Sequence, residues 1–93
     1  MTAQHTPGPW WVTDSGVRDG GGFICARIPA QRYEGQDERF EREFAERIAN
    51  CRLIAAAPDM LAALRAVMDP ETHWAEARRQ VLTAIAKATG EST

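Results

Sequence analysis

The chain has 93 residues, of which 44% are hydrophobic and 26% charged, and its net charge at pH 7 is −2. This composition is typical of one small globular domain and excludes a disordered or fibrous chain. No apolar run approaches the ~20 residues of a membrane span, and the N-terminus lacks the pattern of a secretion signal. We therefore expect a cytoplasmic protein with no membrane partner. Bulk nucleic-acid binding is not expected, because it requires a basic face that neutralises many phosphates.

The first third of the chain has the residue pattern of β-strands. Residues 10–13 (WWVT) are aromatic and β-branched, and residues 22–28 (GFICARI) alternate between two faces. The intervening DSGVRDGGG is rich in residues that favour tight turns. The pattern predicts a β-hairpin, or a small sheet, within residues 5–35, with Pro29 ending the second strand.

The three glycines at residues 20–22 have a second interpretation as a phosphate-binding loop. Such loops lead from a strand into the N-terminus of a helix, where backbone N–H groups point at the phosphate. Here the glycines lead into another predicted strand. The sequence therefore favours a turn.

The apolar spacing changes to about 3.6 residues in the second part of the chain and predicts three helices within residues 37–90. Pro58 divides the first helix from the second, because proline fits the first turn of a helix but not its interior. Asp69 is predicted to cap the third helix, and Gly90 to end it. The apolar side of the second helix is Met60, Leu61, Leu64, Val67 and Met68, and the expected buried side of the third is Trp74, Ala77, Val81, Leu82, Ile85 and Ala88.

Strands followed by helices favour an α+β fold. We expect a single domain of residues 1–93, in which an N-terminal antiparallel β-hairpin packs against three C-terminal helices. The helices can cover only one face of the strands. With strict alternation, the helix-facing residues are Trp10, Val12, Ile24, Ala26 and Ile28, and the outward-facing residues are Trp11, Phe23, Cys25 and Arg27.

The residues that could carry chemistry form no recognisable catalytic or metal-binding pattern. The spacing of His5, Cys25, Cys51 and His73 matches no compact zinc motif. No serine or cysteine is placed beside a histidine and an orienting carboxylate. We therefore expect a protein that is not an enzyme, with no catalytic residue, no metal and no cofactor, and with both cysteines reduced and buried.

Binding is the function class that remains. The outward face of the strands would be an exposed patch of aromatic residues and arginine, of the kind enriched at protein interfaces. The candidate binding residues are Trp11, Phe23, Arg27, Arg42 and Arg47. The same patch could instead be buried in a homo-oligomer, a dimer or higher, and both interpretations stay open.

Two segments carry a resemblance to a known group of proteins. Residues 5–10 read HTPGPW and residues 49–64 read ANCRLIAAAPDMLAAL. Together they resemble a widespread group of small phage and prophage proteins that begin with His-Thr-Pro-Gly-Pro-Trp and carry an ANARLIAAAP(D/E)LL stretch. Cys51 and Met60 depart from that stretch, and both are conservative packing changes. The resemblance implies a phage or prophage gene expressed in the bacterial cytoplasm, and small accessory phage proteins often act against host defences.

Three functions follow as hypotheses. The first is a non-enzymatic counter-defence inhibitor that binds and blocks a host immune protein such as a CRISPR effector. The second is an oligomeric protein that sequesters a nucleotide immune signal, with arginine pairing to phosphate and an aromatic ring stacking on the base. The third is a regulatory or structural component of the phage. The first is the hypothesis that we favour, the other two are alternatives, and the sequence does not identify the partner or ligand.

Overall fold

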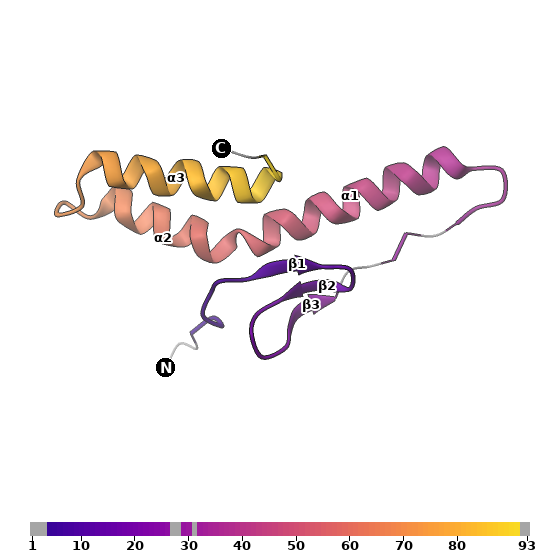
Figure 1. Cartoon of the computed structure of the whole chain (residues 1–93), viewed down its shortest axis with the longest axis horizontal. Helices are drawn as coiled ribbons and strands as arrows, with labels where there is room; N and C mark the ends of the chain where they lie inside the picture. The colour runs from indigo at the N-terminus through magenta and orange to yellow at the C-terminus, as the bar shows by residue number, and fades with distance from the viewer. Residues whose placement is uncertain (1–3, 27–28, 31, 92–93) are drawn as a thin grey trace.

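A computed structural model of the chain describes residues 4–26, 29–30 and 32–91. It confirms the predicted α+β fold, with an N-terminal antiparallel sheet followed by three helices (Figure 1). The elements are β1 (Trp11–Thr13), β2 (Gly16–Arg18), β3 (Phe23–Ala26), α1 (Asp37–Ala55), α2 (Ala57–Met68) and α3 (Trp74–Thr89). Within these described ranges, no helix combines the length and the hydropathy that crossing a membrane requires.

The sheet has three strands in the order β1-β2-β3, one more than a simple hairpin. The additional strand β2 lies inside the DSGVRDGGG segment that the sequence predicts as a turn. A two-residue turn at Asp14 and Ser15 joins β1 to β2 and brings Thr13 opposite Gly16. Gly16 has a φ of 147°, a conformation that is strained for any residue with a side chain. The predicted turn residues therefore form two short turns with a strand between them.

The glycines at residues 20–22 connect β2 to β3, and the turn interpretation is confirmed. The Asp19 carboxylate accepts hydrogen bonds from the backbone N–H groups of Gly21 and Gly22, both at 2.8 Å. These donors hold the pKa of the Asp19 carboxyl below its ordinary value. The N–H groups that a phosphate would need are thus already occupied by a carboxylate of the chain itself.

A β-bulge between β2 and β3 decides which residues face the helices. Val17 lies opposite Cys25, but its neighbour Arg18 lies opposite Phe23, which leaves Ile24 as the extra residue. Consecutive residues of a strand point to opposite faces. Phe23 and Cys25 therefore lie on opposite faces of the sheet, which corrects the expectation that they share one.

The core lies where the sheet meets the C-terminal half of α1. Its centre is Val17, Cys51 and Ala55, and the half-buried residues packed against them are Trp10, Val12, Ile24 and Cys25. The predicted helix-facing positions of Trp10, Val12 and Ile24 are confirmed. Ala26 is exposed instead, because the bulge shifts the alternation of β3. Ile28 lies outside the described residues.

The junction of α1 and α2 is where the two segments that carry the resemblance meet. α1 ends at Ala55, and Pro58 is near the start of α2, as predicted. Gly8 packs directly on the proline ring, because a Cβ added at Gly8 would lie 2.8 Å from the Pro58 Cβ. The HTPGPW segment therefore lies against the helix junction and needs a residue without a side chain there.

A Gly8→Ala substitution is expected to lower the free energy of unfolding by about 1–3 kcal/mol, the usual cost of overpacking a close contact. Urea unfolding followed by circular dichroism measures the loss. Gly20→Ala is the matched control, since a Cβ at Gly20 meets nothing within 4 Å. Equal losses in the two variants would contradict the role of the Gly8–Pro58 contact.

α3 begins later than predicted. Its N-cap is His73, whose Nδ1 accepts the N–H of Ala75 at 3.1 Å. Asp69 closes the preceding turn instead, where its carboxylate accepts the N–H of Glu71 at 2.9 Å and the hydroxyl of Thr72 at 3.1 Å. The prediction of Asp69 as the helix cap is therefore wrong, because nearer donors in the loop occupy the carboxylate.

α2 and α3 form an antiparallel hairpin, with an ion pair of 2.7 Å between Asp59 at its start and Lys87 at its end. The helices meet through small side chains: the buried residues of the pair are Ala63, Ala66, Ala77 and Ala84. Most of the large apolar residues expected in the interior are exposed: Met60, Leu64, Val67, Met68, Trp74, Leu82 and Ile85. The alanines let the helices approach closely, so that larger side chains lie beside the seam. Gly90 ends α3 as predicted.

Candidate functional site

The face of the sheet that points away from α1 carries a row of three large side chains, one from each strand. Trp11 lies opposite Arg18, and Arg18 lies opposite Phe23. Trp11 is 44% and Phe23 is 53% exposed. The Arg18 Cζ atom lies 4.5 Å from the centre of the Phe23 ring, a cation–π contact that orients the guanidinium. We call these three residues the Trp–Arg–Phe row.

The row confirms that Trp11 and Phe23 share one exposed face, and it adds a residue that the sequence prediction missed. Arg18 was missed because it lies in the segment assigned to a turn. The available signal was Val17 next to Arg18, an apolar–polar alternation directly after a short turn. Arg27, predicted beside these aromatic residues, lies outside the described residues.

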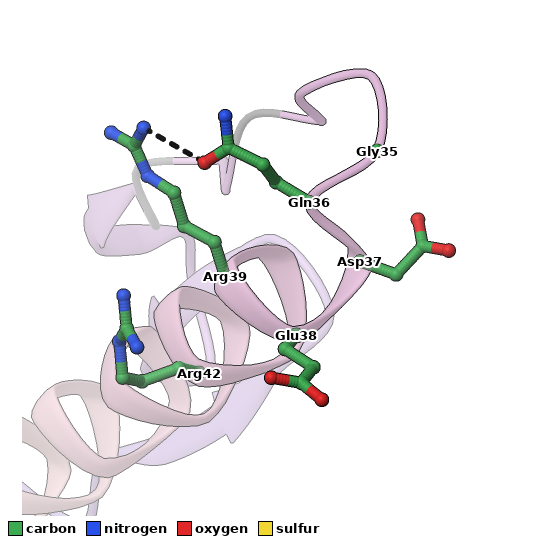
Figure 2. Close-up of a pocket in the computed structure, with 6 residues that line it drawn as sticks. All are labelled: Gly35, Gln36, Asp37, Glu38, Arg39 and Arg42. Carbon is green, nitrogen blue, oxygen red and sulfur yellow. Dashed lines mark hydrogen bonds between the residues drawn. The ribbon is translucent and has the colours of Figure 1, made fainter.

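Arg42 lies near the start of α1, whereas the sheet packs on the C-terminal half of that helix. It borders a shallow hollow of about 470 Å³ whose lining is Gly35, Gln36, Asp37, Glu38, Arg39 and Arg42. Figure 2 shows both guanidinium groups on one side and both carboxylates on the other. Arg39 is held by the Glu43 carboxylate at 3.1 Å and by the Tyr33 ring at 3.7 Å. The hollow is therefore lined by two carboxylates and two guanidinium groups.

Arg47 is half-buried, and its Nε has no hydrogen-bond partner among the described residues. Glu43, one helical turn earlier, pairs with Arg39 instead. Arg42 and Arg47 are five positions apart and so point to different sides of α1. The structure does not bring these two arginines together, and neither is part of the Trp–Arg–Phe row.

The histidines and cysteines contact other parts of the fold and do not lie together in a reactive site. His73 caps α3, and the exposed His5 ring lies 6.4 Å from the Trp10 ring, measured between ring centres. Cys25 is half-buried and Cys51 buried, both as thiols within the core. Over the described part of the chain, no three His, Cys, Asp or Glu residues are grouped so that they could hold a metal ion.

One pKa that lies far from its ordinary value belongs to an exposed pair of residues on α3. Hydrogen bonds from Arg79 and then from Gln80 lower the pKa of Glu76 to about 2, and the same contact raises the pKa of Arg79. Shifted groups often mark a reactive site. Here an ordinary pairing of residues three apart on α3 explains the shift, so it points to no chemistry.

Comparison with known proteins assigns the chain to a family. Residues 1–92 match the family described as Salmonella phage P22 protein Y8K6. The chain belongs to this family. No curated protein and no solved structure shows a significant match. The P22 Y8K6 match includes α3, which lies beyond the two segments that carry the resemblance, and it confirms that the chain is of a phage protein family.

Proposed function

We propose that this member of the P22 Y8K6 family is a non-enzymatic counter-defence protein. It acts in the host cytoplasm by binding a host immune protein, such as a CRISPR effector, and blocking it. The observation that carries the proposal is the exposed Trp–Arg–Phe row on the outer face of the sheet. The phage family supplies the biological setting.

The row has the composition of a protein-binding hot spot. Tryptophan and arginine are enriched among the residues that contribute most to binding at protein interfaces. Trp11 and Phe23 each keep roughly 100 Å² exposed, which is worth about 2.5 kcal/mol per residue when a partner covers it. Adjacent strands hold the three side chains in register, so little conformational freedom is lost on binding.

A protein partner is favoured over a nucleotide signal by the surroundings of the candidate phosphate ligands. The amides of the glycine turn are occupied by Asp19. Arg42 and Arg47 point to different sides of α1. A nucleotide would need several donors converging on its phosphates, whereas a protein partner needs an exposed face with anchoring side chains.

The test combines phage plating with direct binding. Bacteria with an active CRISPR system express the protein, and the purified chain is titrated against the purified effector. We expect the wild type to restore phage plating, and Trp11→Ala or Phe23→Ala to weaken binding by roughly 30-fold, as for a hot spot of about 2 kcal/mol. Leu53→Ala is the matched control, because Leu53 is also 53% exposed but lies on α1.

Two outcomes would overturn the proposal. One is wild-type protein that neither protects phage nor binds the effectors tested. The other is a large rise in melting temperature with cyclic nucleotides or ADP-ribose derivatives, which would favour sequestration of a nucleotide signal. Inhibition that survives both row substitutions would place the contact elsewhere on the chain.

A further inference from the structure

One side of the α2–α3 hairpin is apolar and uncovered. A groove of about 170 Å³ runs between the helices, and every residue that lines it is apolar: Met60, Ala63, Leu64, Val81, Ala84 and Ile85. Helical spacing extends this surface toward the loop that joins the two helices, because Val67 follows Met60 by seven positions and Trp74 precedes Val81 by seven. Leu64 is 62% exposed, and Val67 and Trp74 are also exposed. We call this surface the hairpin face.

The opposite side of the same hairpin is polar. The hollow there is lined by Asp59, Ala62, Arg79, Gln80 and Thr83. The ion pair between Asp59 and Lys87 also joins the two helices. The hairpin is therefore amphipathic. One side is polar and faces solvent, and the other side is apolar and is not covered by any described part of the chain.

The chain as a whole exposes more surface than a compact monomer. Its accessible surface is 7065 Å² and its mass is 10.3 kDa, whereas a monomer of this mass exposes about 5,400 Å². The radius of gyration is 16.2 Å, against about 12 Å for a compact domain of this length. The excess of about 1,700 Å² lies within the roughly 1,000–2,500 Å² that each subunit buries in a permanent homodimer.

We propose that the chain forms a homodimer in which the hairpin faces of two copies pack against each other. A two-fold interface brings the same residues of both copies together. The groove lining carries no charge, so two copies meet there without repulsion. The outer face of the sheet suits self-association less well, because a two-fold axis would bring two Arg18 guanidinium groups together.

In this dimer, α2 and α3 of each copy contribute to a four-helix arrangement. Leu64 and Ile85, which border the groove of one copy, lie against the groove of the other. The interface goes beyond the proposed function and is independent of it, since it uses α2 and α3 rather than the Trp–Arg–Phe row. It leaves the row available to a host protein.

Light scattering after size-exclusion chromatography tests the proposal with the purified full chain at micromolar concentration. We expect the wild type to have twice the mass of 10.3 kDa, and Leu64→Glu to have the monomer mass while retaining its helical circular dichroism. Ala62→Glu is the matched control, because it introduces the same charge two residues away on the polar side of the hairpin. We expect Ala62→Glu to remain dimeric.

A monomeric wild type would overturn the proposal, as would a folded Leu64→Glu variant that remains dimeric. Dissociation by Phe23→Glu but not by Leu64→Glu would instead place the interface on the sheet. Plating and effector binding are separate readouts, so failure of the dimer and failure of the proposed function are distinguishable.

Discussion

Val17→Asp is expected to leave most of the chain unfolded at room temperature. Val17 is the largest side chain that is fully buried among the described residues, and it lies at the centre of the core with Cys51 and Ala55. An aspartate there would be a buried charge without a partner, which costs several kcal/mol. A chain of this length has a total stability of about 5–14 kcal/mol. One residue of a three-residue strand therefore controls a large share of the stability.

Circular dichroism and urea unfolding measure this effect, and Val17→Ala provides a milder variant that still folds. We expect Val17→Ala to lower the free energy of unfolding by about 2 kcal/mol, through lost burial and the cavity left behind. Leu53→Asp, an exposed position on α1, should cost less than about 1 kcal/mol. A cooperative, near wild-type transition for Val17→Asp would contradict the assignment of Val17 to the core.

Trp10→Ala is expected to lower the free energy of unfolding by about 3 kcal/mol, at the low end of the range for a core tryptophan because the side chain is only half-buried. Trp10 packs against the core, and its indole N–H donates to the carbonyl of Thr6 at 3.2 Å. Its loss removes a core contact and releases the N-terminal segment from the helix junction.

Trp11→Ala is the internal control for this prediction, since Trp11 neighbours Trp10 but points to the other face. We expect it to cost less than Trp10→Ala, because 44% of Trp11 is exposed and its side chain lies outside the core, and we expect His5→Ala to have little effect. Urea titrations of the three variants measure the order of their losses in the free energy of unfolding. A larger loss for Trp11→Ala than for Trp10→Ala would mean that the faces of β1 are assigned the wrong way round.

The helices were predictable to within a residue or two where proline and strong periodicity mark them. The 3.6-residue spacing from Asp37 and the break at Pro58 are local signals, and α1 and α2 follow them. The start of α3 was not predictable in this way. The choice between Asp69 and His73 as the cap depended on which donors the loop brings to the Asp69 carboxylate, a property of the folded turn.

The sheet was predicted in kind but not in detail. A strand of three residues such as β2 is shorter than the periodicity that would reveal it, and the bulge at Ile24 arises from pairing with a neighbouring strand. For the same reason, Trp11 and Phe23 could be assigned to one face from alternation, whereas Arg18 between them could not. Arg18 was placed in the candidate site by its pairing with neighbouring strands, not by the local residue pattern.

The exposure of the large residues of α2 and α3 was also beyond prediction from periodicity. An amphipathic pattern identifies an apolar side of a helix but not the neighbour that covers it. In this chain the neighbouring helix covers the alanines, and Met68 remains 80% exposed.

The sheet packs on α1, whereas the hairpin face is formed by α2 and α3, so the two candidate surfaces use different elements of one small chain. A dimer joined through the hairpin faces consequently carries two Trp–Arg–Phe rows. If the target is itself a multi-subunit complex with repeated sites, binding of the first row makes binding of the second an intramolecular event. Avidity can then exceed the affinity of a single row by about 10²–10⁴ without any new contact. Joining two copies would in this way compensate for the small size of each binding face.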